Sequence, residues 1–235
     1  MNFTALLKNT LAQSGISLPD GGAEKLAAFN AELLVVNEQM NLTAITEPSE
    51  MAEKHYADSL FGAPLLPEGG RVLDVGSGAG FPGVPLAVAR QDVEMTLLDA
   101  LAKRLRFIET ALQKAGIPPL VLLHGRAEQY GADPAWRESF DAVTARAVAN
   151  LAALCEYCLP LVRPDGVFLA YKGPGADEEI GAAQNALKTL GGTVENVVKH
   201  TLPGGEERNI LVIRKTAATP PRFPRNTKKI KERTL

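Results

Sequence analysis

Ten consecutive residues, Asp74 to Gly83, constrain the fold of this chain more than any other segment. They read Asp-Val-Gly-Ser-Gly-Ala-Gly-Phe-Pro-Gly, follow a short apolar run at 71–75 and precede a helical pattern that begins near Val84. Glycines permit a tight turn and let a ligand approach the backbone closely. A simple strand-to-helix connection does not need glycines at three alternate positions. The segment therefore predicts an α/β fold that binds a ligand at this loop.

The chain after residue 70 alternates between strand-like and helix-like segments. Apolar and β-branched runs predict strands over 71–75, 93–99, 120–124, 140–144 and 166–171, with a closing pair over 193–199 and 208–214. Helical spacing starts near 84 and recurs over 103–115, 149–162 and 177–190. Alternation of this kind indicates a parallel sheet covered on both faces. We predict a seven-stranded, mostly parallel, Rossmann-like sheet with an antiparallel hairpin at one edge.

Three helical segments precede the alternation, over 3–13, 21–40 and 49–61, the last with Ser49 as its expected N-cap. We therefore divide the chain into a helical cap (1–65), a Rossmann-like domain (66–215) and a basic tail (216–235). The last 22 residues hold eight basic residues and one acid, whereas the whole chain has a net charge of −2. Because this end also carries three prolines, we expect much of it to be extended or mobile and able to bind a polyanion.

Composition excludes several classes of protein. Two cysteines cannot form a disulfide scaffold, and no apolar run reaches the roughly 18 residues of a membrane span. The first residues lack the features of a secretory signal. We expect a cytoplasmic protein with no membrane partner. Cys155 and Cys158 form a C-x-x-C pattern inside an apolar helical run, but no second ligand pair accompanies them, so we expect buried thiols and no metal.

The ligand of the glycine loop has two candidates. Gly78, Gly80 and Gly83 satisfy G-x-G-x-x-G, which suits a dinucleotide, and Asp99 ends the next strand, where an acid holds the hydroxyls of a ribose. That geometry serves NAD and S-adenosylmethionine equally. Asp74 favours the second, because an acid before the loop suits a cationic amino-acid group and repels a pyrophosphate. The antiparallel hairpin also favours it, as does Arg126, which lies in a loop able to bind a purine edge.

Further segments, taken in order, resemble one family. They are Asn37-Glu38-Gln39-Met40-Asn41-Leu42-Thr43, His55-Tyr56-Ala57-Asp58-Ser59-Leu60, the glycine loop, Leu97-Leu98-Asp99, Arg126-Ala127-Glu128, Arg146-Ala147-Val148, Leu169-Ala170-Tyr171-Lys172-Gly173 and Glu207-Arg208-Asn209. This combination resembles the bacterial ribosomal RNA small subunit methyltransferase G family over nearly the whole chain. Two departures are Tyr171, where the family commonly has leucine, and the absence of a glycine often found before Thr219-Pro220.

The resemblance implies a class I methyltransferase that uses S-adenosylmethionine and methylates N7 of a guanine, at position 527, in 16S ribosomal RNA. It implies as a partner the small ribosomal subunit or its precursor, and no DNA. Donor-contacting positions by resemblance are Gly76, Phe81, Ala127, Glu128 and Arg146; the loop glycine Gly78 and the ribose acid Asp99 complete the predicted donor site.

The chemistry of the acceptor sets the other predictions. Guanine N7 carries a free lone pair, so we expect no general base, and His55 is interpreted as a positioning or packing residue. Candidates for positioning the guanine or its phosphates are Arg126, Arg146, Lys172, Arg208, Asn41 and His55.

Two alternative functions remain. One is an NAD-dependent oxidoreductase, which would want a Tyr-x-x-x-Lys pair that the chain lacks, and the other is a non-catalytic ribosome-binding protein.

Overall fold

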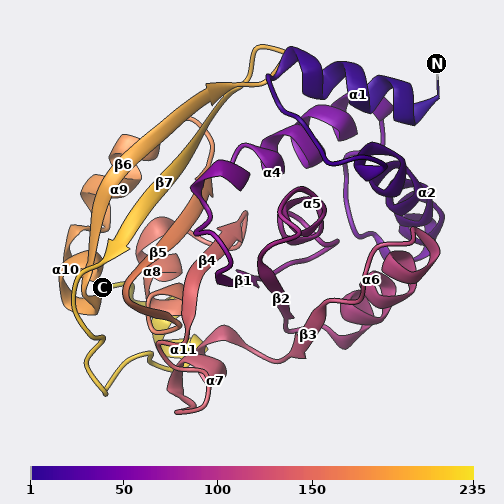
Figure 1. Cartoon of the computed structure of the whole chain (residues 1–235). Coiled ribbons are helices and arrows are strands. Elements are labelled where there is room, and N and C mark those ends of the chain that lie inside the picture. The colour runs from indigo at the N-terminus through magenta and orange to yellow at the C-terminus, as the bar shows by residue number, and fades with distance from the viewer. Residues whose placement is uncertain (1) are drawn as a thin grey trace.

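A computed structural model describes residues 2–235 (Figure 1). Its single sheet has seven strands in the order β3-β2-β1-β4-β5-β7-β6. Their bounds are β1 Arg71–Val75, β2 Glu94–Asp99, β3 Val121–His124, β4 Phe140–Arg146, β5 Val162–Lys172, β6 Gly192–Thr201 and β7 Glu207–Lys215. The first five strands pair in parallel, and β7 pairs antiparallel with both β5 and β6. The predicted mostly parallel sheet with an antiparallel edge hairpin is confirmed.

Helices cover both faces of the sheet (Figure 1). Their bounds are α1 Phe3–Gln13, α2 Gly22–Met40, α3 Pro48–Glu50, α4 Asp58–Leu60, α5 Gly83–Ala89, α6 Ala102–Lys114, α7 Ala127–Ala132, α8 Leu151–Cys158, α9 Ala176–Ala182, α10 Gln184–Leu190 and α11 Thr227–Glu232, with a π-helical turn η1 at Met51–Ala57 and a 3-10 turn η2 at Ala63–Leu65. None of the helices in residues 2–235 is long and apolar enough to cross a membrane.

Alternating strand residues separate two hydrophobic clusters. On β1, Val72 packs with α1, α2, α5 and α6, whereas its neighbour Leu73 packs with α8, α10 and α11. This period of two is what a parallel sheet buried on both faces requires. The N-terminal helices thus share one core with the first face of the sheet, because Leu26, Phe29 and Leu33 of α2 belong to the same cluster as Val72. The division at residue 65 stays a prediction.

Three local predictions were wrong. The segment 49–61 is capped by Glu47, whose side chain accepts from the Glu50 N–H, and its middle is the π-helical turn η1 rather than a regular helix. The helix predicted over 177–190 is broken between α9 and α10. The tail is not free: residues 216–226 have no regular secondary structure, but Phe223 and Ile230 are buried against the second face of the sheet, and α11 forms near the chain end.

The sheet order reverses between β1 and β4. In open α/β sheets, ligands bind outside the carboxyl ends of the strands at such a switch point. The glycine loop leaves β1 at this point, and the residues after β4 face it from the neighbouring strand. The topology therefore places the glycine loop and the residues after β4 together at the carboxyl edge of the sheet.

Candidate functional site

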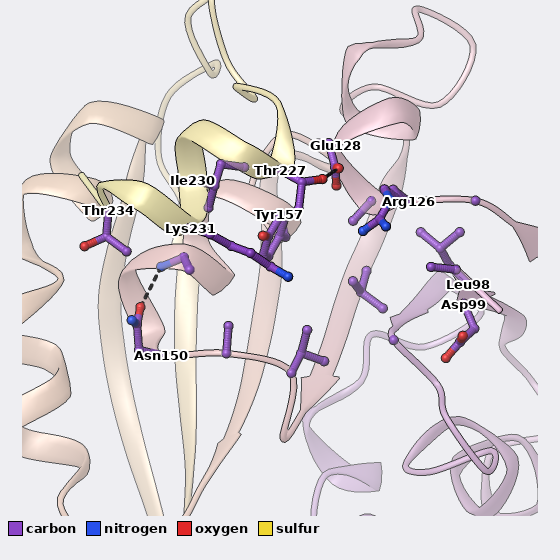
Figure 2. Close-up of a pocket in the computed structure, with 18 residues that line it drawn as sticks. Leu98, Asp99, Arg126, Glu128, Asn150, Tyr157, Thr227, Ile230, Lys231 and Thr234 are labelled. Atoms are coloured by element: carbon purple, nitrogen blue, oxygen red, sulfur yellow. Dashed lines mark hydrogen bonds between the residues drawn. The ribbon is translucent and has the colours of Figure 1, made fainter. Parts of the chain in front are cut away.

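A cavity of about 440 Å³ lies at the carboxyl ends of β1, β2 and β3 (Figure 2). Its walls come from the glycine loop, the Asp99–Ala100 turn, residues 125–128, residues 148–150 after β4, and the helices α8 and α11. We call it the donor cavity. Four of the predicted donor residues line it, namely Gly76, Asp99, Ala127 and Glu128, and so does Arg126, which was predicted to position the substrate.

The glycine loop needs its glycines for two physical reasons. Gly76 has φ of 74° and Gly78 has φ of 58°, in the left-handed region that favours glycine. A Cβ added to Gly76 would also lie 2.7 Å from Cγ2 of Val148. The Gly76 N–H donates to the Leu98 carbonyl over 2.8 Å, which ties the loop to β2. The loop thus presents bare backbone to the donor cavity.

Asp99 ends β2 with a carboxylate that is held in place by its own chain. It accepts from the N–H of Gly78 at 2.9 Å and from the N–H of Leu101 at 2.8 Å, and Nη1 of Arg104 lies 3.3 Å from Oδ2. Asp99 is 3% exposed, yet it lines the donor cavity. A carboxylate offers about four acceptor positions, so this one has capacity left for a hydroxyl of a ligand.

Asp74 does not face the ligand cavity, although its place before the glycine loop led us to expect this. Its carboxylate is fully buried and accepts from the Gly83 N–H at 3.1 Å and the Thr144 hydroxyl at 3.0 Å. Burial raises the pKa of Asp74 to about 6. It does not line the donor cavity. Asp74 therefore fixes the glycine loop onto α5 and β4, and the interpretation of it as a direct partner of a cationic group finds no support in this geometry.

A second cavity, of about 550 Å³, brings together four of the predicted positioning residues. His55, Arg146, Lys172 and Arg208 line it, with Lys54, Asp58 and Glu179. They come from η1, the end of β4, the end of β5 and the start of β7. Four cations and two carboxylates line this cavity, so it carries an excess of positive charge. We call it the acceptor cavity.

Arg146 is anchored by one nitrogen only. Nη1 donates to Oδ2 of Asp58 at 2.8 Å and to the carbonyl of Lys54 at 2.9 Å. In residues 2–235 its other guanidinium nitrogens have no hydrogen-bond partner, although the guanidinium carbon lies 5.4 Å from the centre of the Phe81 ring. The anchored side chain thus keeps donors free for a ligand. Arg146 lines the acceptor cavity and not the donor cavity.

His55 is a buried, neutral ring in the wall of the acceptor cavity. Nε2 lies 2.8 Å from the hydroxyl of Thr43, and the ring stacks on Phe81 with centroids 4.6 Å apart. Desolvation, together with the nearby charge of Arg146, lowers the pKa of His55 to about 4. The structure therefore places Phe81 under His55 and Arg146, in contact also with Phe29 and Tyr56, rather than in the wall of the donor cavity.

Lys172 connects the acceptor cavity to the loop after β4. Its Nζ donates to the Ala149 carbonyl at 3.0 Å and to Oε2 of Glu179 at 2.7 Å. Glu179 also accepts from the N–H of Leu151 at 2.7 Å. Arg208 pairs with Glu206, and its Nε lies 4.0 Å from Oδ1 of Asp58. Both cations are thus oriented by carboxylates, as Arg146 is.

Two candidates lie outside this cluster. Asn41 is exposed at the C-terminal end of α2 with φ of 49° and lines neither cavity. Arg126 lines the donor cavity, where its backbone N–H donates to Gln129 at the start of α7. Gly78, one of the predicted donor residues, does not line the donor cavity, but its N–H orients Asp99. The ligand-binding roles of all these residues stay predictions.

The residues after β4 separate the two cavities. Arg146 and Ala147 line the acceptor cavity, whereas Val148, Ala149 and Asn150 line the donor cavity. Ala147 has φ of 56°, an uncommon conformation for a residue with a side chain, and one that often marks a functional constraint. The two cavities therefore adjoin along this short segment.

Sequence reasoning missed Asp58, Thr43 and Thr227. Asp58 and Thr43 fall inside quoted segments, but nothing in their spacing shows that they hold Arg146 and His55. Thr227 lies in a tail expected to be mobile, and its hydroxyl donates to Glu128. The C-x-x-C thiols are buried as predicted, and burial raises the pKa of Cys155 to about 12.

Solved structures resemble this fold at low sequence identity. An O-methyltransferase from Bacillus cereus in complex with SAH matches with a TM-score of 0.57 and 16% identity, covering 91% of this chain and 100% of that one. A SAM-dependent O-methyltransferase from Thermotoga maritima matches with a TM-score of 0.52 and 18% identity, covering 80% and 72%. These similarities show the class I methyltransferase fold.

Sequence relatives are much more similar. The GidB family profile, described as rRNA small subunit methyltransferase G, matches residues 22–211. The ribosomal RNA small subunit methyltransferase G of Lactobacillus delbrueckii subsp. bulgaricus is 45% identical over 225 residues, covering 94% of both chains. The enzyme of the same name from Symbiobacterium thermophilum is 47% identical over 232 residues, covering 95% of this chain and 94% of its own. The predicted resemblance is confirmed, and the chain belongs to the ribosomal RNA small subunit methyltransferase G family.

Proposed function

We propose that this protein transfers a methyl group from S-adenosylmethionine to N7 of a guanine, the one at position 527, in 16S ribosomal RNA, and that it does so in the cytoplasm. One observation carries the proposal: a cavity suited to a nucleoside and a cation-lined cavity adjoin across residues 146–150. Methyl transfer needs this arrangement, because donor and acceptor must meet in line. Membership of the family favours this reaction over the oxidoreductase alternative.

The donor cavity fits the chemistry of S-adenosylmethionine. Its volume lies within the range of roughly 300–1,000 Å³ typical of small-molecule sites. Asp99 would accept from the ribose hydroxyls, residues 126–128 would contact the adenine, and the bare backbone at Gly76 would lie along the amino-acid part. The bound donor supplies an electrophilic sulfonium methyl, so the protein needs to place it rather than to activate it.

The acceptor cavity suits a guanine that has left its helix. The major groove of duplex RNA is too deep and narrow for side chains, so the substrate is a loop or an unfinished ribosomal region. Guanine N7 attacks with its own lone pair, and no proton must leave first. His55, which is buried and neutral, would pack beside the base and need not act as a base.

Arg146, Lys172 and Arg208 would position the RNA. Arginine often binds O6 and N7 of guanine together, but here N7 must stay open to receive the methyl. The free guanidinium nitrogens of Arg146 would therefore bind O6 or a flanking phosphate. Because the methylated base is cationic, the same guanidinium would repel the product and assist its release.

The experiment is methyl transfer followed by mapping of the product. The protein is incubated with labelled S-adenosylmethionine and with small-subunit RNA or particles from cells that lack the enzyme. A single N7-methylated guanine in 16S RNA is the expected result. Binding of S-adenosylhomocysteine without transfer to any RNA or particle would instead support a non-catalytic ribosome-binding protein, and transfer to another base or molecule would overturn the proposed acceptor.

A further inference from the structure

The C-terminal helix α11 forms one wall of the donor cavity. Thr227, Ile230, Lys231 and, just after the helix, Thr234 line the cavity together with the glycine loop and residues 125–128. In Figure 2 this helix lies beside α8, and Thr227 meets Glu128 at the cavity wall, away from Asp99. A segment that lies 70 or more positions after the other walls in sequence thus completes the site.

Several contacts fix this segment independently of Thr227. Arg225 binds the buried carboxylate of Glu156 with its backbone N–H and its Nε, both at 2.8 Å from Oε1. The Asn226 side chain caps α11 by accepting from the Lys229 N–H at 3.0 Å, and Ile230 is fully buried. Because these contacts hold the helix, a change confined to the Thr227 hydroxyl leaves the wall in place.

The Thr227 hydroxyl donates to Oε1 of Glu128. In residues 2–235 no other group donates a hydrogen bond to this carboxylate. Glu128 lies in the first turn of α7, is half-buried and faces the donor cavity. Hydrogen bonds to a charged acceptor are stronger than those between neutral groups and fix its direction. Thr227 therefore determines where the free oxygen of Glu128 points.

We propose that Thr227 is a positioning residue for the methyl donor, acting from the C-terminal helix through the carboxylate of Glu128. The inference rests on the proposed function, in which Glu128 contacts the nucleoside part of S-adenosylmethionine. Without the hydroxyl, Glu128 can rotate into solvent, and the donor must then order that side chain when it binds. The basic C-terminal segment is thereby a part of the donor site.

Two variants at Thr227 separate the hydroxyl from the shape of the side chain. Thr227→Val keeps the volume and removes the donor, whereas Thr227→Ser keeps the donor. We expect Thr227→Val to weaken S-adenosylhomocysteine binding, measured by calorimetry, roughly three- to tenfold. Thr227→Ser should bind nearly as wild type does. Thr110→Val is the matched control, because its hydroxyl donates within an exposed turn of α6, to the Arg106 carbonyl at 3.0 Å.

A second background tests the route through Glu128. In Glu128→Ala protein, which has no side-chain acceptor at this position, Thr227→Val should cause little further loss, because the two changes remove one interaction. Equal binding by wild type, Thr227→Val and Thr227→Ser, at equal melting temperatures, would overturn the inference, and so would a full additional loss in the Glu128→Ala background. Failure of the wild-type protein to bind S-adenosylhomocysteine at all would overturn the proposed function instead.

Discussion

Nη1 of Arg146 lies 2.8 Å from Oδ2 of Asp58, and this ion pair joins the end of the central strand β4 to the helix that follows the π-helical turn η1. Both side chains are largely buried, and His200 lies 3.4 Å from the other carboxylate oxygen. The pKa of Asp58 is lowered because the hydrogen bonds from His200 and Arg146 and the positive charge of Arg146 outweigh the effect of its burial. The N-terminal helical segments are thus tied to the carboxyl edge of the sheet by an ionised pair.

Substitution of Arg146 should affect the reaction more than RNA binding. Arg146→Lys keeps a charge beside Asp58 but loses the planar group with its free nitrogens. We expect the single-turnover rate of methylation to fall roughly tenfold or more, since misplacement of the base alone has such effects. The Kd for RNA, measured by filter binding, should change much less.

Arg146→Ala is the harsher variant. It leaves Asp58 buried without its closest partner, and breaking such a pair lowers the free energy of unfolding by roughly 3–5 kcal/mol. Adding Asp58→Asn should restore part of that stability but not the rate. An equal loss of rate and RNA affinity in Arg146→Lys would show that Arg146 only binds RNA.

The rate of methyl transfer should be nearly independent of pH between about 6 and 9. His55 cannot serve as a base in this range through an ordinary titration, because desolvation and Arg146 lower its pKa to about 4. Single-turnover rates at saturating donor and RNA measure this directly. We expect His55→Gln, which keeps a nitrogen near the Thr43 hydroxyl, to retain most of the rate. A rate that rises with pH in wild type and is flat in His55→Gln would identify His55 as a base after all.

Between pH 4 and 6.5, stability should respond to pH mainly through two buried groups of opposite sign. The pKa of His55 is about 4 in the folded protein and ordinarily 6.5, so the unfolded chain takes up the proton first. Its contribution is complete above pH 6.5 and is lost as pH falls to 4, on the order of 3 kcal/mol. The pKa of Asp74 is about 6 and ordinarily 3.8, so its contribution is lost as pH rises from 4 to 6.

Urea unfolding of His55→Gln separates these two effects. With the histidine removed, the free energy of unfolding should fall as pH rises from 4 to 6, because the Asp74 effect is no longer opposed. Adding Asp74→Asn should make stability flat in that window, since the amide can still accept from the Gly83 N–H. If His55→Gln and wild type follow the same curve, the histidine is not buried as described.

The sheet and the donor cavity were predictable because their determinants are local. Left-handed φ values explain Gly76 and Gly78, and the two-residue period of strands explains why Val72 and Leu73 enter different cores. For the acceptor cavity, the sequence predicted which residues take part but not how they contact one another. Nothing in the sequence indicates that Arg146 meets Asp58, which lies 88 positions earlier, or that Phe81 lies under His55.

The tail was mispredicted for a physical reason. Prolines and positive charge are typical of mobile chain ends, and this composition does not indicate the few residues that hold this tail against the sheet. Phe223 and Ile230 enter the core, and Arg137 donates to the carbonyls of Phe223 and Thr219. Contacts of this kind join residues more than 80 positions apart, so neither composition nor periodicity reports them.

The pair of Arg225 and Glu156 should contribute strongly to stability. Glu156 is 1% exposed, and Arg225→Ala would leave its carboxylate without the guanidinium. We expect the free energy of unfolding, measured in urea, to fall by roughly 3 kcal/mol. Lys8→Ala provides the control, because it removes an exposed ion pair with Glu24 and should leave stability nearly unchanged. Similar small losses in both variants would mean that Glu156 is solvated in solution.

Salt dependence tests whether the docked tail also contacts RNA. Deleting the tail would remove Arg225 and Ile230 and disturb the core, so point changes at exposed cations are better. Arg222 and Lys229 are exposed on this segment and line neither cavity. Each phosphate contact to single-stranded RNA contributes about 0.7 to the slope of log affinity against log salt concentration. The Arg222→Ala, Lys229→Ala protein should therefore show a slope shallower by about 1.4.

Lys114→Ala is the control, because its charge is already paired with Glu32 at 2.6 Å and its loss should leave the slope unchanged. An unchanged slope in the double variant would remove these tail cations from the RNA interface and leave the tail with its role at the donor cavity.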